Sequence, residues 1–370
     1  MVRSATPASP ATSSPHPYRA PSAPPAAKQA PHSDPDACSE RARVLVLRHG
    51  WNTTAHQALD GRLRRWFSAA GDGLVAYSEH ASVRLVAGAP VAPLERLAAV
   101  AAEFEAAAAR AGKRVCYFGA EERLLRSGDY AAHLIGMHPV WTPATWAERF
   151  DGSASLRAQR SRAGNKGVRV HEAPGASERS AAVAACHAAW LAEKRLPALG
   201  FLAHTDPNAL APGALADRRL FVATLGQAPG RERPGTVVGY VTAAPIPQRA
   251  GWLIDKVVRR RSAPNGTAEL LLDTAIRRLA PSAERITLGL APLALPGRAQ
   301  ERRDAAPAWL HAAEWAARRW GRALYDFEGL QAFKRKFRPD AWEPVYLLTP
   351  ARRIGVRECV ALAAAFLATR

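Results

Sequence analysis

The sequence lacks an apolar run that could cross a bilayer, which takes about 20 residues. Its longest C-terminal apolar stretch, Cys359–Ala368, has only ten. The N-terminus also lacks an apolar core followed by a small-residue cleavage site, which a signal peptide would contain. We therefore expect a cytoplasmic protein that is soluble or peripheral on the inner face of the plasma membrane.

Cysteine is scarce, and the few residues present are far apart. The four positions are Cys38, Cys116, Cys186 and Cys359. None forms a Cys-x-x-Cys pair or lies near clustered histidines, so neither a zinc site nor a disulfide framework is indicated. We expect isolated thiols in a reducing cytoplasm, and no metal.

Acidic residues are too few to balance the basic ones. The chain has 51 Lys and Arg against 32 Asp and Glu, which gives a formal net charge of +19. Such a positive field attracts polyanions, for example tRNA, DNA or an anionic lipid surface. Frequent arginine can also reflect base composition, because alanine is abundant as well. The charge therefore indicates a class of partner without identifying it.

The composition changes along the chain. Residues 1–42 contain nine prolines and few large apolar side chains, so this tail should be disordered. Residues 43–150 and 151–350 each alternate apolar strands with helices, and residues 351–370 are expected to end the chain as a helix. A chain of 370 residues with 48% hydrophobic composition can bury one large core or two moderate ones.

The alternation of strands and helices predicts an α/β or α+β fold. Helices are expected over Pro93–Gly112, Leu156–Ala163, Ala181–Lys194, Thr267–Leu279 and Ala308–Trp320, and another begins at Glu121. Strands are expected over Leu74–Tyr77, Val83–Ala87, Val115–Phe118, Leu220–Leu225, Thr236–Ala243, Trp252–Val258, Ile286–Leu290 and Val345–Leu348.

The segment Tyr325–Leu347 combines aromatic residues, closely spaced cations and a Trp-Glu-Pro corner. Phe327, Leu330 and Phe333 recur at helical spacing, which would bury one face. The cations then gather where this helix ends, at Lys334, Arg335, Lys336 and Arg338. A cation cluster on a rigid support suits phosphate binding. The alternative is a solvated helix end, because Lys and Arg favour last turns.

The strand, loop and helix over Asp255–Leu271 form a second candidate site. Free N–H groups at the helix start, beside Asn265 and Gly266, could bind an anion next to Arg259 and Arg260. A plain Asn-Gly turn is the alternative. Asp255 ends a predicted strand, where ligand sites of α/β sheets gather. It could instead form a salt bridge with the neighbouring arginines.

These segments resemble the C-terminal catalytic domain of the phosphatidylglycerol lysyltransferases (aminoacyl-phosphatidylglycerol synthases), in the family's order. The match runs from about Trp66 to Leu348 and corresponds to a stand-alone version without the family's membrane-embedded flippase part. The matching segments are Gly88–Val91, Leu156-Arg157, Trp190–Lys194 with Gly200-Phe201, Asp255, Ala263–Gly266, Leu288–Leu293, and YDFEGLQAFKRKF followed by WEPVYL.

The resemblance implies two tandem GCN5-related N-acetyltransferase-like units around a central basic helix, Leu156–Ala163. It also implies transfer of an amino acid from aminoacyl-tRNA, as co-substrate and without a cofactor, to the hydroxyl of a phosphatidylglycerol-like lipid at the membrane surface. Asp255 would hold the aminoacyl ammonium or help to deprotonate the acceptor. Lys334 and Lys336 would stabilise developing negative charge or anchor phosphate. Apart from the resemblance, Arg157, Arg160 and Arg162 on the linking helix could contact tRNA or lipid phosphates, or they could form a solvated face.

Some positions depart from the family pattern, at Ala89, at Leu202–His204 and at Val258, where the family has Arg. These departures leave open a non-catalytic relative that binds tRNA or lipid. A separate alternative is an acyl-CoA-dependent N-acyltransferase, although Ala263 replaces the usual Arg or Gln of a pyrophosphate loop, and Pro264 removes an N–H donor.

Overall fold

The computed structural model describes residues 35–193, 201, 205–226, 235–292, 327–350 and 355–367. The first described element is helix α1 (Pro35–His49), whose Ala42, Leu45 and Val46 are buried. Residues 35–42 therefore belong to a packed helix, and not to the disordered tail that their proline and alanine content predicted. The expected helix Ala308–Trp320 and His204 lie outside the described residues.

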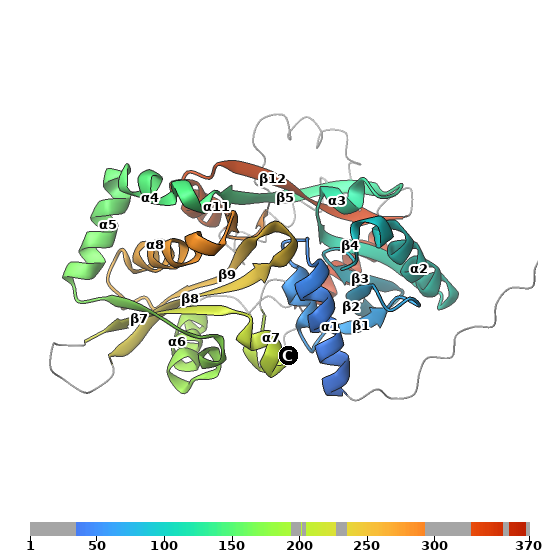
Figure 1. Ribbon diagram of the computed structural model, residues 1–370, viewed down its shortest axis with the longest axis horizontal. Helices are drawn as coiled ribbons and strands as arrows, with labels where there is room; N and C mark the ends of the chain where they lie inside the picture. Colours follow the sequence, from blue (N-terminus) through green and yellow to red (C-terminus); the bar gives the residue numbers. More distant parts are fainter. Residues whose placement is uncertain are drawn as a thin grey trace, which may run out of the picture. The chain divides into compact units, whose positions relative to one another are not determined.

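Twelve described strands form one mixed sheet (Figure 1). Its order is β1-β2-β3-β4-β12-β5-β10-β9-β8-β7-β6, and β11 pairs with β5. The strands are β1 (Arg64–Phe67), β2 (Leu74–His80), β3 (Val83–Ala87), β4 (Arg114–Ala120), β5 (Ala131–Trp141), β6 (Arg169–Pro174), β7 (Arg219–Leu225), β8 (Thr236–Ile246), β9 (Gly251–Arg259), β10 (Arg285–Thr287), β11 (Ala291–Pro292) and β12 (Ala341–Thr349).

The sheet contains an internal repeat. In the first repeat, β1, β2 and β3 are antiparallel neighbours, and helix α2 (Leu97–Arg110) connects β3 to the parallel strand β4. In the second, β7, β8 and β9 are antiparallel, and helix α8 (Thr267–Leu279) connects β9 to the parallel strand β10. This repetition supports the tandem arrangement that the family resemblance implied.

The two repeats exchange their last strands. β5 follows the first repeat in sequence but pairs with β10 of the second, and β12 follows the second repeat but pairs with β4 of the first. β5 and β12 pair with each other in an antiparallel ladder at the centre of the sheet. Each predicted unit, 43–150 and 151–350, thus contributes a strand to the other's half of the sheet.

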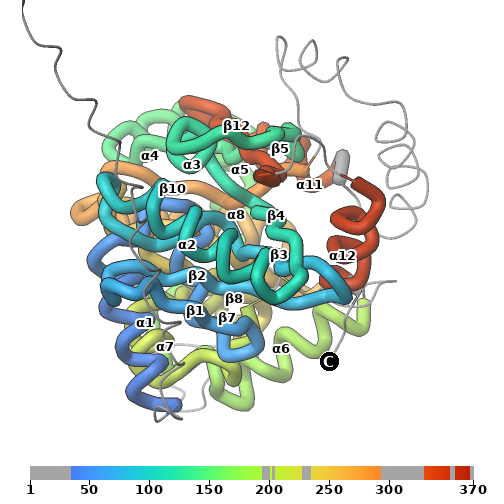
Figure 2. Tube along the Cα trace, turned by 90° about the vertical axis from the view of Figure 1, so that its right-hand side faces the viewer, coloured from blue at the N-terminus to red at the C-terminus, as the bar shows by residue number. Residues whose placement is uncertain are grey.

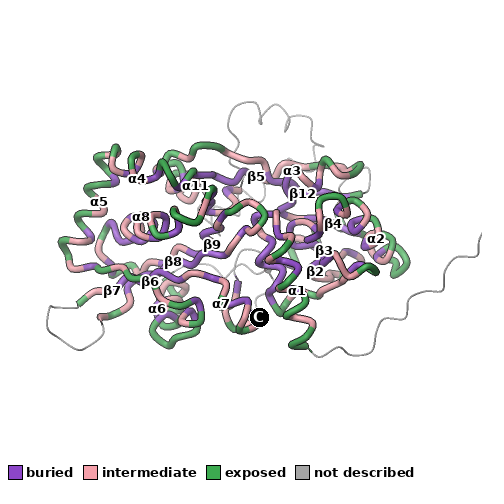
Figure 3. The backbone as a smooth tube through the Cα atoms, in the orientation of Figure 1, coloured by how far each residue is buried: buried purple, intermediate pink, exposed green. Residues whose placement is uncertain are grey.

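Helices cover both faces of the sheet. In the first repeat, α2 and helix α12 (Val356–Leu367) lie on opposite sides of β3 (Figure 2). In the second, α8 packs on one face and helix α6 (Ala181–Ala192) on the other. The buried residues follow the central strands, whereas the outer helix surfaces are exposed (Figure 3). Among the described residues, no helix is long and apolar enough to span a bilayer.

The basic linking helix is α5 (Ala154–Asn165), which begins after the N-cap Ser153. It was expected between the two units, but it packs against helix α4 (Pro143–Asp151) and against α8 of the second repeat. The apolar residues Leu156 and Ala163 hold α5 in this position, because both are buried with residues of α8 in the core of the second repeat.

Shorter elements complete the described chain. They are the 3₁₀ helices η1 (Ala55–Leu59), η2 (Leu94–Arg96), η3 (Gly175–Arg179), η4 (Pro207–Ala209), η5 (Pro247–Arg249) and η6 (Ala280–Ser282), and the helices α3 (Glu122–Leu125), α7 (Pro212–Ala216) and α11 (Phe327–Lys336). The expected strand Ile286–Leu290 ends at Thr287, because Gly289 adopts a φ of 69° and turns the backbone.

Candidate active site

The centre of the second repeat contains a fork between two parallel strands. β9 and β10 pair from Gly251 with Arg285 as far as Leu253 with Thr287. Beyond this point β9 continues and β10 ends, so the two chains diverge. Such carboxyl ends of parallel strands are where α/β folds place ligands. The sequence places Asp255 and Gly289 two residues past the last pair, one on each arm.

A β-bulge directs the Asp255 side chain. In the antiparallel pairing of β8 with β9, Thr242 is opposite Lys256 and Ala243 is opposite Ile254, which leaves Asp255 as the extra residue. Bulges re-aim side chains near functional sites. Here Asp255 and its neighbour Lys256 both reach one buried charge cluster, although adjacent strand residues normally point to opposite faces.

This charge cluster consists of Glu178, Arg218, Asp255 and Lys256. Arg218 Nη2 donates to both carboxylate oxygens of Asp255, at 3.0 and 2.9 Å, and its Nε donates to Glu178 at 3.0 Å. Lys256 Nζ donates to the other oxygen of Glu178 at 2.6 Å. The side chains of Arg218 and Asp255 are 0% and 5% exposed. Asp255 thus forms a salt bridge, with Arg218 and not with the arginines next to it in sequence.

Asp255 remains ionised in this setting. Burial alone would raise its pKa, but the charges of Arg218 and Lys256, with hydrogen bonds from Thr242 and Arg218, hold the pKa below its ordinary value. Thr242 donates to Asp255 at 2.6 Å. A carboxylate with a lowered pKa is a poor proton acceptor but can hold a cationic group.

Lys334 lies on the other arm of the fork. Its Nζ donates to the carbonyl oxygens of Gly289 and Leu290, at 2.9 and 2.7 Å, and the residue is 4% exposed. Burial lowers its pKa to about 7. Helix α11, which carries Lys334, is anchored where Trp141 of β5 donates to the carbonyl of Phe337 at 2.8 Å. The structure thus brings Asp255 and Lys334 to the two arms of one fork.

Lys336 and Arg338 point elsewhere. Lys336 Nζ forms an ion pair with Glu269, in the first turn of α8, at 2.5 Å. Arg338 is exposed and has a left-handed φ of 49°, and its carbonyl accepts a hydrogen bond from Arg149 at 2.7 Å. The two lysines of the cationic helix end therefore differ: Lys334 reaches the fork and Lys336 joins two helices.

The start of α8 is closed on one side. Gly266 has a φ of 94°, and a Cβ there would lie 1.9 Å from the carbonyl oxygen of Gln159 in α5. Glu269 adds negative charge to the same helix start, where an anion would otherwise be favoured. Asn265 is exposed in the turn, and Arg259 bonds the carbonyl of Ala263 at 3.0 Å. These contacts disfavour a pyrophosphate at this position.

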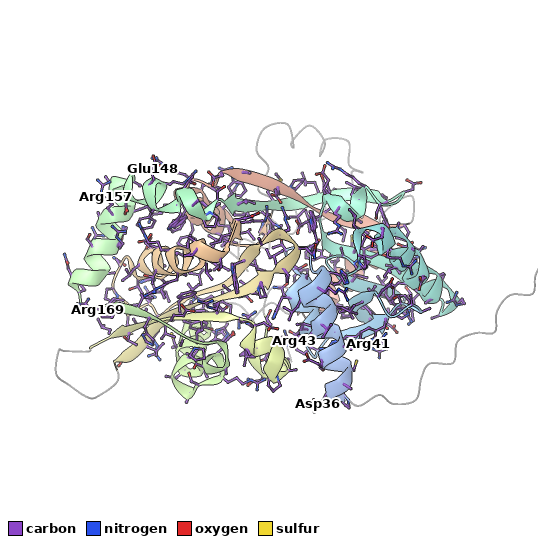
Figure 4. The ribbon with its side chains drawn as sticks, in the orientation of Figure 1. Asp36, Arg41, Arg43, Glu148, Arg157 and Arg169 are labelled. Atoms are coloured by element: carbon purple, nitrogen blue, oxygen red, sulfur yellow. The ribbon has the colours of Figure 1, made fainter. Side chains whose placement is uncertain are left out.

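The candidate arginines of the linking helix have different roles. Arg160 forms ion pairs with Asp273 at 2.8 Å and with Asp151 at 2.9 Å, so it joins α5 to its neighbours. Arg157 is exposed and bonds a backbone carbonyl. Figure 4 shows Arg157 in the first half of α5 and Arg169 beyond the end of this helix, at the start of β6. Arg260 donates its backbone N–H to Val238 at 2.9 Å and is half-buried.

A second buried charge cluster was not predicted as a site. Arg249 bonds Glu121 and Glu343, each at 2.8 Å, and Arg285 bonds Glu343 at 2.7 Å. Glu343 belongs to the Trp-Glu-Pro corner, which was the available sequence signal. The backbone N–H of Thr53 donates to Glu121 at 2.6 Å. The cluster therefore connects β12, β10 and α3 to the chain before η1.

A shallow hollow lies in the first repeat, away from the fork. It is lined by His49, Trp51, Asn52, Ala89, Pro90, Ala92, Leu97, Arg123 and Leu124. The Arg123 guanidinium lies over the Trp51 ring, 5.3 Å from its centroid. None of the predicted site residues lines this hollow.

Comparison with known proteins agrees with the resemblance in the sequence. The family model described as phosphatidylglycerol lysyltransferase, C-terminal, matches residues 43–349. The phosphatidylglycerol lysyltransferase of Bacillus subtilis (strain 168) is 25% identical over 323 residues, which cover 83% of this chain and 34% of that protein. The chain thus spans about a third of the length of this relative.

Solved structures share the fold. The C-terminal domain of a putative lysylphosphatidylglycerol synthetase from Agrobacterium fabrum has a TM-score of 0.69 and 21% identity, covering 90% of this chain and 99% of that one. L-PGS from Bacillus licheniformis has a TM-score of 0.70 and 21% identity, covering 90% of this chain and 95% of that one. FemX has a TM-score of 0.54 and 10% identity, covering 85% of this chain and 96% of that one. The predicted mixed α/β fold is confirmed, and it is shared with these solved structures. The chain belongs to the phosphatidylglycerol lysyltransferase C-terminal family.

Proposed function

We propose that the protein is an aminoacyltransferase that moves an amino acid from aminoacyl-tRNA to a hydroxyl of a phosphatidylglycerol-like lipid at the membrane surface. The observation that carries this proposal is the fork, with the ionised Asp255 on one arm and the buried Lys334 on the other. Family membership supports lipid aminoacyl transfer as the reaction class.

The transfer needs a site that binds the aminoacyl group and stabilises negative charge. The acceptor oxygen bonds to the ester carbonyl carbon, the bond to the tRNA 3′ oxygen breaks, and the hydroxyl proton ends on that 3′ oxygen. Lys334 has two N–H groups committed to carbonyls and one more to offer to the oxyanion. Because the ester already stores the required energy, no further cofactor is proposed.

Asp255 would hold the ammonium of the transferred amino acid. Its two oxygens accept two hydrogen bonds from Arg218 and one from Thr242. A carboxylate has about four acceptor positions, so one remains for a substrate cation. Its lowered pKa keeps the negative charge at physiological pH.

Exposed cations of α5 and its C-terminal end would contact tRNA or lipid phosphates. Arg157, Arg162 and Lys166 are exposed, and none forms an ion pair with a described carboxylate. Unpaired surface cations of this kind supply the electrostatic part of nucleic-acid binding. We do not assign this role to Arg160, because its guanidinium already forms two ion pairs.

The test is transfer of label to lipid. The protein is incubated with a mixture of radiolabelled aminoacyl-tRNAs and phosphatidylglycerol vesicles, and label in the lipid fraction is counted. We expect transfer from one or a few tRNAs, and about 100-fold less with Lys334→Met, as for loss of one oxyanion donor. Lys113→Met, which removes a lysine that pairs with Glu79 on the first repeat, is the control.

Absence of label with every charged tRNA would overturn the proposal. A calorimetric titration with acetyl-CoA covers the acyl-CoA alternative. Because Gly266 contacts α5 and Pro264 has no N–H, we expect no binding, whereas micromolar affinity would favour an N-acyltransferase.

A further inference from the structure

The segment from Asn52 to Asp60 is polar, yet it is buried between the two repeats. Helix η1 within it contacts β2 and β3 of the first repeat and β8 of the second. Its buried polar side chains, with their exposed fractions, are Asn52 (5%), Thr53 (1%), His56 (1%), Gln57 (6%) and Asp60 (5%). Buried polar groups are costly unless they have hydrogen-bond partners.

Several of these residues do have partners. Asn52 Nδ2 donates to the carbonyl of Gly119 at 3.1 Å, and Asp60 accepts from Arg62 at 2.5 Å. The hydroxyl of Thr53 and both ring nitrogens of His56 have no hydrogen-bond partner among the described residues, and His56 is the larger of the two polar groups. The backbone of Ala214 lies near the ring without the geometry of a hydrogen bond. A completely buried imidazole that forms no full hydrogen bond with the described residues is available to a bound polar group.

His56 lies within electrostatic range of Arg218 and Asp255 in the charge cluster of the candidate active site. Burial and the charge of Arg218 lower its pKa to about 3, while the charge of Asp255 opposes this shift. The ring is therefore neutral at physiological pH, with one N–H donor and one lone-pair acceptor. Positive charge at the ring is disfavoured, so an ammonium group would meet the same penalty there.

A hydroxyl group matches this environment. It carries no charge, it can donate to the imidazole lone pair, and it can accept from the imidazole N–H. A phosphate or carboxylate would need several donors, of which the neutral ring offers one. An ammonium has a better position at Asp255, whose carboxylate is ionised.

We propose that His56 binds the attacking hydroxyl of the acceptor and orients it toward the ester held between the arms of the fork. This inference rests on the proposed aminoacyl transfer and adds the residue that recognises the acceptor. His56 acts as a neutral hydrogen-bonding group, so the ring does not store the proton. Three groups then share the substrates: Asp255 binds the ammonium, Lys334 the oxyanion and His56 the hydroxyl.

The kinetic test compares His56→Leu with His56→Gln. Leucine fills a similar volume without polar atoms, whereas glutamine restores a donor and an acceptor. We expect His56→Leu to raise KM for the lipid about three- to tenfold, which is the change in affinity expected from losing one hydrogen bond. KM for aminoacyl-tRNA should be unchanged. His56→Gln should recover most of the loss. His80→Leu, on the outer part of β2, is the control for replacing a histidine.

The pH profile separates binding from acid–base catalysis. If His56 acts only as a neutral hydrogen-bonding group, its titration should cause no rise or fall of kcat/KM in wild-type protein between about pH 5.5 and pH 8. A limb that disappears in His56→Gln would contradict the role assigned here. Removal of unsatisfied nitrogens should leave the Tm of His56→Leu no lower than that of wild type.

A binding measurement does not depend on turnover. Vesicles of phosphatidylglycerol are compared with vesicles of phosphatidylmethanol, which has the same charge and no free hydroxyl. We expect wild-type protein to prefer phosphatidylglycerol about three- to tenfold, and His56→Leu to bind both equally. If His56→Leu keeps the wild-type preference and KM, the inference is wrong even though lipid transfer stands. If wild-type protein transfers no label, the proposed function fails while this comparison still reports on His56.

Discussion

At the scale of single residues, Lys334 is unusual because a lysine ammonium is rarely enclosed. It is 4% exposed, and its described hydrogen-bond partners are the carbonyls of Gly289 and Leu290. Two carbonyl dipoles compensate only part of the hydration that the ammonium loses, so its pKa falls to about 7. The chain therefore loses stability in order to keep a titratable amine at the fork.

This cost gives a pH dependence of stability. Between the folded pKa of about 7 and the unfolded value of 10.5, the unfolded chain binds a proton that the folded chain does not. Stability therefore rises with pH through this window. We expect wild type to gain about 1–3 kcal/mol relative to Lys334→Met between pH 7 and pH 9. Urea unfolding of both proteins at pH 7 and pH 9 measures this gain. If the difference in unfolding free energy between them is the same at both pH values, the pKa of Lys334 is not lowered.

Asp255 should be costly to remove alone. Asp255→Ala leaves the guanidinium of Arg218 buried with one carboxylate instead of two. We expect a loss of about 3–5 kcal/mol in the free energy of unfolding, as for other broken buried ion pairs. Glu122→Ala, which removes an exposed partner of Arg126 on α3, should cost less than about 0.5 kcal/mol. Similar losses in the two variants would mean that the Arg218 cluster is hydrated.

The contacts of single residues were also the hardest feature to predict from the sequence. Motif position identified Asp255 and Lys334, but the partner of Asp255 is Arg218, which lies in no recognised motif. His56 occurs in a polar segment without helical or strand periodicity, so no pattern indicated its burial. Lys334 and Lys336 are equivalent in sequence, and only their position on α11 separates their roles.

At the scale of elements, the contact between α5 and α8 depends on one glycine. Gly266→Ala would combine a left-handed φ of 94° with a Cβ at 1.9 Å from the carbonyl of Gln159. Gly112, with a φ of 67°, has nothing within 4 Å of its virtual Cβ. We expect Gly112→Ala to cost about 1–2 kcal/mol and Gly266→Ala about 2–3 kcal/mol more. Thermal unfolding of both variants tests this, and equal costs would show that α5 can move away.

Local patterns predicted many elements well. The strand Val83–Ala87 and the helix Thr267–Leu279 agree with the structure to the residue. β5 was missed because its sequence mixes polar and apolar residues without strict alternation. The exchange of β5 and β12 was also missed, since pairing between strands about 200 residues apart leaves no local signal.

At the scale of the whole molecule, the net charge of +19 should make the proposed binding of aminoacyl-tRNA salt-dependent. If α5 contacts the phosphates, Arg162→Glu should weaken tRNA binding about three- to tenfold and make the salt dependence shallower. Arg110→Glu, an equal charge change at an exposed position of α2, should have a smaller effect. Filter binding at several salt concentrations measures both. Equal effects would indicate a diffuse field without a preferred face.

The exchange of last strands also has a consequence for biosynthesis. The ribosome delivers β4 and β5 before the second repeat, but the strand that separates them in the sheet, β12, is translated after that repeat. Until then both nascent edges are unpaired and could join with another chain. The centre of the sheet can close only after β12, residues 341–349, has left the ribosome. We therefore expect the two halves of the sheet to join only once both repeats have been synthesised.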